Sequence, residues 1–287
     1  MAVYKLGYQR YRGPLTGRWT RFMVLPRHAW RRLYQERLVL LLTMLAFVWP
    51  LLCAGFIYLT NHATLLQGID EPEFRQFIQV DGRFFAIFMY VQGGFAVFLA
   101  ALAGPGLLAP DLANNALPLY FSRPLTRLSY ALARLTVLVG MLSIVTWVPG
   151  LLLFGLQVGL AGGWWFRANW TLGAGMLAGF LLWLLVLSLV AMASSAYVKW
   201  RIVAAAVSLA FFFILSGVAE MIDSVFRVTW GHIIDPAWSV NQVWCALLGI
   251  EPPEGPGAGA SALVLAALVL VLVAVIERKL RPVEIVS

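Results

Sequence analysis

The residue types that most often carry chemistry are few in this chain and widely spaced. The three histidines, His28, His62 and His232, show neither paired spacing nor an HExxH pattern that would hold a metal ion. No GxxxxGK[ST] phosphate-binding loop and no GxSxG nucleophile turn occur. The two cysteines, Cys53 and Cys245, offer neither a disulfide framework nor a Cys-rich metal site. The sequence therefore predicts no catalytic residue, no metal site, no cofactor and no ATP hydrolysis by this chain alone.

Acidic residues of the loops between apolar runs could take part in a reaction at the membrane surface. They are Asp70, Glu71, Glu73, Asp81, Glu220, Asp223 and Asp235. A solvated loop explains them as well as a reactive site does. If Glu220, Asp223, His232 and Asp235 surrounded one cavity, the chain would be a membrane-embedded enzyme acting on lipid or quinone.

Polar residues inside the apolar runs are scarce. We single out Gln92, Gln157 and Glu220. A proton- or ion-coupled carrier needs buried acids or bases to load and release its ion. The scarcity of such residues predicts that the energy source of any transport lies outside the membrane-spanning part.

The composition places the chain in a lipid bilayer. Of 287 residues, 61% are apolar and only 12% are charged, and the mean hydropathy is +0.83. A chain with so few charged residues cannot cover its own surface with polar groups in water. A soluble fold is therefore excluded, and the many aromatic residues, 14% of the chain, suit the headgroup level of a bilayer.

Six apolar runs are each long enough to cross a hydrocarbon core of about 30 Å as a helix. They are Leu38–Thr60, Phe84–Ala109, Leu135–Ala161, Thr171–Tyr197, Ile202–Ala219 and Ala258–Ile276. The expected fold is an all-α integral membrane protein with six transmembrane helices. A cytoplasmic arm (1–37) precedes the membrane domain (38–276), and a basic cytoplasmic tail (277–287) follows it.

The distribution of Lys and Arg predicts the orientation. Most of the 21 basic residues fall on the arm, the tail and the connections after the second and fourth runs. Basic residues next to spans favour the cytoplasmic side, so both termini are expected there. The net charge of +8 thus indicates topology, and no nucleic-acid partner is expected.

The arm is predicted to form an amphipathic helix along the membrane surface. Its apolar and basic residues recur at helical spacing, most clearly at Trp19, Phe22, Trp30, Arg31 and Arg32. The apolar face would lie among lipid headgroups while the arginines meet anionic lipid. Pro26 is expected to bend this helix or split it.

Two other segments depart from plain spans. Val218, Met221, Ile222, Val225 and Phe226 form one helical stripe, and the stretch Trp238–Ile250 is apolar but too short to cross. Both are predicted as short outer helices between the fifth and sixth spans.

Small and helix-breaking residues gather in the second span at Gly93, Gly94, Gly104, Pro105 and Gly106. They indicate either close helix packing or a bending point.

The connection from Pro110 to Tyr130 is longer and more apolar than a simple link requires. Leu112, Leu117 and Tyr120 would contact water unless another protein or the bilayer covered them. Arg123, Arg127 and Arg134 add positive charge beside these residues. The pattern therefore indicates a contact surface for a partner.

This connection resembles the coupling segment in permease subunits of the second ABC exporter family, the ABC type-2 membrane proteins. The residues that carry the resemblance are Asp111, Asn114, Asn115, Leu117, Tyr120, Arg123, Pro124 and Arg127. The basic tail Arg278–Val286, the arm and the plan of six spans are also similar to those of the family. The chain differs where Asn114-Asn115 replaces a frequent Gly-Thr-like pair and where Leu117-Pro118 interrupts the helix.

The resemblance implies a permease that pairs with a second copy of itself or a homologous permease and with two ABC ATPase subunits. The ATPases would bind ATP and Mg²⁺ and drive an exporter through the coupling helix. The family also implies multi-pass insertion among the lipids of a bacterial-type inner membrane. The remaining alternative is a non-catalytic membrane anchor or scaffold, which predicts assembly without stimulated ATP turnover.

Overall fold

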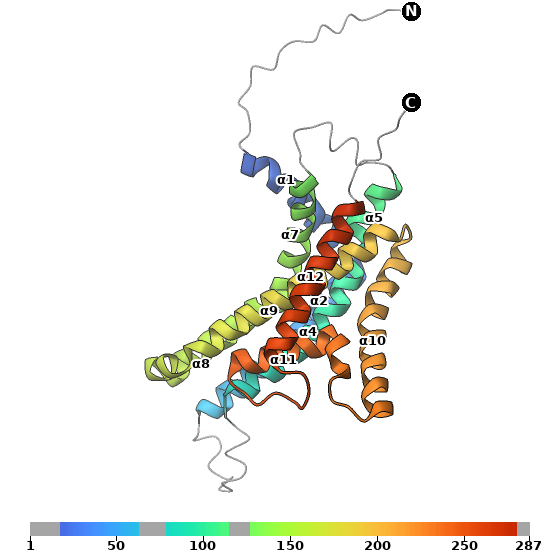
Figure 1. The fold of residues 1–287 in the computed structure, drawn as a ribbon. Helices are drawn as coiled ribbons and strands as arrows, with labels where there is room; N and C mark the ends of the chain where they lie inside the picture. Colours follow the sequence, from blue (N-terminus) through green and yellow to red (C-terminus); the bar gives the residue numbers. More distant parts are fainter. Residues whose placement is uncertain (1–17, 63–78, 115–126, 280–287) are drawn as a thin grey trace, which may run out of the picture.

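The computed structural model describes residues 18–62, 79–114 and 127–279. Within these ranges the regular secondary structure is entirely helical, and six helices are long and apolar enough to cross a membrane. The predicted all-α membrane fold is confirmed (Figure 1).

Two spans, α2 (Arg37–Asn61) and α12 (Ala258–Lys279), lie close to their predicted bounds. The fifth span, α10 (Arg201–Phe226), begins where predicted but ends about two turns later. The stripe from Val218 to Phe226 is the last part of α10, so the prediction of a separate short helix there is wrong. Since nothing in that stripe breaks a helix, the fifth span simply continues through it.

The second span is divided into α4 (Gly82–Ala103) and α5 (Pro105–Ala113). Gly104 separates them, because Pro105 has no N–H to continue the hydrogen bonding. A side chain at Gly104 would collide with Ala191 on a neighbouring helix. The small residues therefore serve both predicted purposes, since Gly104 lies at the break and is also a point of close packing.

The third and fourth spans begin about two turns earlier than predicted. The third consists of α7 (Arg127–Val145) and α8 (Trp147–Ala161), which meet at Thr146. The fourth is α9 (Gly163–Tyr197), separated from α8 by Gly162 alone, at a φ of +89° that favours glycine. Arg134 and Asn169 fall just outside the predicted spans, yet both lie within these helices.

The helix α9 is the centre of the bundle (Figure 1). It packs against α4, α5, α7, α8, α10, α11 and α12, and 67% of its apolar membrane-spanning stretch is buried. The corresponding share is only 22% in each of α2, α10 and α12. These three helices therefore lie at the periphery and present apolar side chains to lipid or to another protein.

The core between α4, α9 and α11 is built from aromatic rings. Trp244 contacts Phe180 and Trp183 at ring-centroid distances of 5.8 and 6.3 Å. Gly93 and Gly179 allow these indoles to approach the backbone, which accepts a hydrogen bond from each indole N–H. The aromatic groups thus join α4, α9 and α11 tightly.

The arm forms one helix, α1 (Arg18–Leu33), with Pro26 inside it, so of the two predicted effects of Pro26, a bend or a split, the split does not occur. Its described side chains show an amphipathic pattern, because Ala29 and Leu33 are buried whereas Arg31 and Arg32 are exposed. The buried side packs against α7.

The predicted outer segment between the fifth and sixth spans contains the 3₁₀ turn η2 (Gly231–Ile234) and α11 (Pro236–Leu248). Asp235 caps α11 by accepting a hydrogen bond from the Ala237 N–H at 2.8 Å. Gly249 ends the helix at a φ of +67°. The expected short outer helix is therefore present.

The bundle has two chemically different ends (Figure 1). The arm end holds α1, α5, the starts of α7 and α10 and the end of α12, whereas the far end holds η2, α11 and the turn between α8 and α9. The described far-end acids are Asp81, Glu220, Asp223, Asp235, Glu251 and Glu254. Basic residues prevail at the arm end, in agreement with the charge pattern of the sequence.

Candidate functional site at the arm end

The predicted coupling segment starts at the end of α5 and returns at the start of α7. Asp111 and Asn114 are described at its beginning, and Asn114 is exposed. Arg127 begins α7. The other predicted residues, Asn115, Leu117, Tyr120, Arg123 and Pro124, lie outside the described residues. Both helices that position the segment are therefore known, and the geometry of the segment itself stays a prediction.

A polar cluster joins the two helices that carry the segment. Asp111 on α5 accepts a hydrogen bond from the Tyr130 hydroxyl at 2.6 Å and forms an ion pair with Arg134. The Arg134 guanidinium also lies 5.2 Å from the centre of the Tyr130 ring. A carboxylate and a guanidinium taken out of water are stable only when they are paired, so this contact fixes α5 to α7.

The cluster is largely shielded from solvent. Tyr130 is fully buried, and the side chains of Arg134 and Asp111 are 10% and 17% exposed. The sequence singled out Asp111 and Arg134 but missed Tyr130. The spacing of Tyr130 and Arg134, four residues apart on one helix face, was the signal that could have found it.

The arm is attached to the same helix α7. The Trp30 indole N–H donates a hydrogen bond to the Val137 carbonyl at 2.8 Å. Gly140 makes this approach possible, because a side chain there would collide with the Trp30 ring. Trp30 was predicted to meet lipid, and the structure places it against protein. Trp19 and Phe22 belong to α1, but their side chains are outside the description.

A third link joins the start of α2 to two other spans. Arg201 at the start of α10 forms an ion pair with Glu36, with 2.6 Å between its Nη1 and the carboxylate, and donates to the Leu102 carbonyl at 3.2 Å. In the link between α1 and α2, burial also raises the pKa of the Tyr34 hydroxyl. Sequence patterns missed the Glu36–Arg201 pair because it connects distant parts of the chain.

The polar residues predicted within spans have structural partners. Gln92 donates to the Ala46 carbonyl at 3.0 Å, and Gln157 accepts from Asn61 at 2.7 Å. Both contacts attach the peripheral helix α2 to its neighbours. They give no indication of an ion-binding site.

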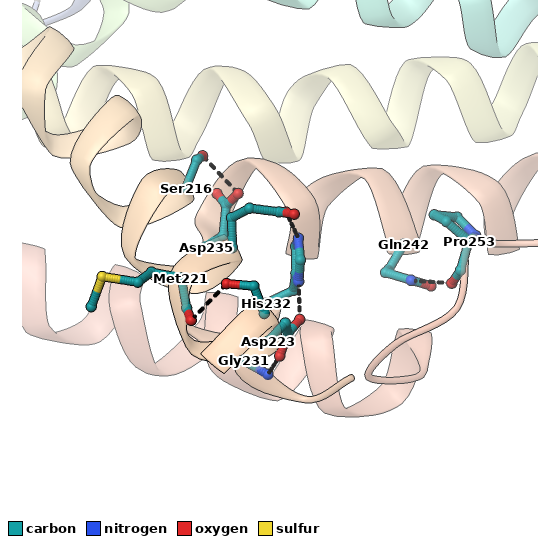
Figure 2. A network of polar contacts seen from close by, with 10 residues as sticks. Ser216, Met221, Asp223, Gly231, His232, Asp235, Gln242 and Pro253 are labelled. Carbon is teal, nitrogen blue, oxygen red and sulfur yellow. Dashed lines mark hydrogen bonds and ion pairs between the residues drawn. The ribbon is translucent and has the colours of Figure 1, made fainter. Parts of the chain in front are cut away.

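At the far end, a second polar cluster surrounds His232 (Figure 2). Asp223 accepts a hydrogen bond from the Gly231 N–H at 2.6 Å and contacts His232 Nδ1. The other ring nitrogen lies 3.5 Å from Glu220, and the ring lies against Trp238 with 4.3 Å between centroids. The cluster thus fixes the turn between α10 and α11.

This geometry bears on the alternative site at Glu220, Asp223, His232 and Asp235. The first three meet, but Asp235 instead accepts a hydrogen bond from Ser216 at 2.7 Å and caps α11. Both nitrogens of His232 are occupied by contacts with carboxylates. Among the described residues, no group of three His, Cys, Asp or Glu is placed to hold a metal ion.

An apolar groove of about 420 Å³ opens between α4, α10 and α11. Gly93 and Gly94 line it on α4, and Phe98, Trp183 and Phe213 are among its aromatic lining residues. Ser216 and Asn241 are its polar members. The groove can accept an apolar molecule with few hydrogen-bonding groups.

Comparison with protein-family models finds no match, and comparison with curated proteins finds none either.

Proposed function

We propose that this chain is the membrane-spanning permease subunit of an ABC transporter, an exporter driven by separate ATPase subunits. The observation that carries the proposal is the arrangement at the arm end. The segment with the family-like sequence pattern connects two helices that Asp111, Tyr130 and Arg134 hold together. An ATPase that moves this segment would therefore move α5 and α7 as a unit.

The contacts of α7 provide a route for that movement. Trp30 attaches the arm to α7, and α7 also packs against the central helix α9. Interfaces of packed helices shift as rigid bodies more readily than they deform. In the proposed cycle, ATP closes the partner subunits, the segment 112–127 follows, and the spans shift. Hydrolysis by the partner resets the arrangement.

The groove between α4, α10 and α11 is the proposed cargo path. It adjoins α10, whose exposed apolar side chains include Phe213 and Ile214. A second permease copy that covered this face would convert the open groove into an enclosed path. The aromatic lining suits an apolar cargo better than a small ion.

The arm end is proposed to face the cytoplasm of a bacterial-type cell. The basic residues of α1, α10 and α12 support this orientation, because positive charge next to spans is retained on the cytoplasmic side. ATPase subunits in the cytoplasm would then reach the segment 112–127.

Co-purification from the native membrane tests the assignment. The tagged chain is extracted in mild detergent, and the bound proteins are identified and quantified by mass spectrometry. We expect a stoichiometric subunit that carries a phosphate-binding loop, and ATP hydrolysis by the complex but not by the isolated chain. Recovery of the chain alone would contradict the proposal. Tight assembly with a partner that lacks a phosphate-binding loop would favour the anchor or scaffold function instead.

A further inference from the structure

A second groove, distinct from the proposed cargo path, opens between α2 and α4 near the far end. Its volume is about 680 Å³. The apolar wall is formed by Trp49, Leu52, Cys53, Phe56, Phe84 and Ile87. Leu52 and Ile87 are 61% and 57% exposed, so the groove is open to the surrounding lipid. The stacked rings of Phe56 and Phe84, 5.5 Å apart, form part of its wall.

A polar cavity of about 480 Å³ adjoins this groove. Asp81 and Arg83 line both spaces, so the apolar groove and the polar cavity meet at these two residues. The polar cavity adds Asn169, Thr171 and Glu251. Together the two spaces form a site that is apolar on one side and charged on the other, as an amphiphile requires.

The position along the bundle suits one leaflet of a bilayer. Trp164 and Trp170 are 79% and 57% exposed on α9, the helix that supplies Asn169, and exposed tryptophans collect at headgroup level. From Phe56 to Trp49 the helix α2 descends by roughly 10 Å. Half of the hydrocarbon core is about 15 Å deep. The groove therefore extends from the headgroup region into the acyl-chain region.

The charged residues of this site differ in whether a contact within the protein already occupies them. The Asp81 carboxylate accepts a hydrogen bond from the Phe84 N–H at 3.0 Å and so caps α4. Arg83 and Glu251 are exposed, and neither forms an ion pair with any other described residue. Within the described part of the chain, one cation and one anion without an ion-pair partner thus line the same cavity.

We infer that this site binds a phospholipid with a zwitterionic, amine-bearing headgroup from the far-end leaflet. One acyl chain lies in the groove between α2 and α4, the phosphate meets Arg83, and the ammonium meets Glu251. Charge complementarity selects this headgroup, since an anionic lipid without an amine would leave Glu251 unpaired and close to negative charge. The inference does not depend on the ABC assignment, because it requires only insertion in a membrane.

Native mass spectrometry of the full chain tests the inference. The purified protein is incubated with mixed micelles that contain equal amounts of phosphatidylethanolamine and phosphatidylglycerol, and the lipid retained per chain is measured. We expect one phosphatidylethanolamine per chain, in severalfold excess over phosphatidylglycerol. Equal retention of the two lipids, or a preference for phosphatidylglycerol, would overturn the headgroup assignment.

Two pairs of variants locate the binding site. Leu52→Trp fills the groove and should lower phosphatidylethanolamine retention about tenfold, whereas Leu51→Trp, on the same helix and 72% exposed but outside the groove, should leave it unchanged. Arg83→Gln should lower retention severalfold, and Arg167→Gln, an exposed arginine of the same end, should not.

Ile87→Trp is a second groove-filling variant, used if Leu52→Trp fails to fold. Unchanged lipid retention in a folded groove-filling variant would overturn the inference. Loss of a dimer in that variant, with lipid retention intact, would assign the groove to a contact between copies of the chain instead.

Discussion

The polar links at the arm end and the cluster around His232 at the far end connect very different distances along the chain. At the arm end, Trp30 and Val137 are 107 positions apart, and Glu36 and Arg201 are 165 apart. At the far end, Asp223 contacts Gly231 and His232 only eight and nine positions away. The arm end therefore joins helices that are distant in sequence, whereas the far-end cluster closes one local turn.

This difference indicates at which end of the bundle a partner protein can displace the spans. A contact between distant helices passes a displacement from one span to another, and a contact within a turn only holds that turn in place. The arm-end links connect α1, α2, α4, α5, α7 and α10, directly or at their ends. We therefore expect substitutions at the arm end to affect partner-stimulated turnover, and those at the far end to affect stability alone.

The largest effect is expected for Arg134→Met. It leaves the Asp111 carboxylate in a poorly solvated site without its cation, which costs about 3 kcal/mol of unfolding free energy. Unfolding of the purified chain by a denaturing detergent measures this loss. The double variant Asp111→Leu with Arg134→Met should recover most of the stability, because no unpaired charge remains. A single variant as stable as the parent would show that the ion pair does not hold α5 to α7.

The next effect is expected for His232→Phe, which keeps a ring against Trp238 but removes both nitrogens. Loss of the hydrogen bond to the Asp223 carboxylate should cost about 1.5 kcal/mol. His28→Phe, at an exposed position of the arm, is the matched control. The comparison between the two ends predicts that ATP turnover of the partner complex stays unchanged in His232→Phe. A strong loss of ATP turnover in a folded His232→Phe variant would contradict the comparison between the two ends.

Trp30→Phe should cost about 1 kcal/mol, because the ring is retained while the hydrogen bond to the Val137 carbonyl is lost. Unlike His232→Phe, it should also lower partner-stimulated turnover, since the arm is then held less firmly on α7. The control is Trp164→Phe at a 79% exposed position of the far end. Equal turnover in both tryptophan variants would mean that the arm contact has no part in coupling.

The smallest effect on stability is expected for Arg201→Gln. Its side chain is 43% exposed, and ion pairs with this exposure contribute about 0.5 kcal/mol. Lys199→Gln, an exposed neighbour without an ion pair among the described residues, is the control. Thermal unfolding of the Arg201→Gln and Lys199→Gln variants in parallel samples compares their stabilities. A loss as large as that of Arg134→Met would show that the Glu36 link is a principal support of the arm end.

The sequence predicted the spans well because hydropathy over 20 residues reflects the thickness of a bilayer. It misplaced the starts of α7 and α9, because the polar residues Arg134 and Asn169 interrupt the apolar runs there. Arg134 is accommodated in a helix because Asp111 neutralises it, and that partner lies on another element. Hydropathy alone cannot supply this information.

The candidate site was predictable only in part. Asp111 and Arg134 were singled out from the pattern around the connection, and the structure brings them together. The pairing of Glu36 with Arg201 and the docking of Trp30 on Val137 depend on how helices pack, which no local spacing encodes. The roles of Arg123 and Arg127 remain predictions from the sequence pattern.

The central claim is that the segment between α5 and α7 receives the action of an ATPase. Its most direct test is ATP hydrolysis by the purified complex in lipid vesicles, with Arg123→Glu and Arg127→Glu combined in one variant and Arg167→Glu at the far end as the control. We predict that the double variant loses stimulated hydrolysis about tenfold, because charge-assisted contacts to the partner are reversed. The control should keep its rate. Equal hydrolysis in both variants would contradict the claim.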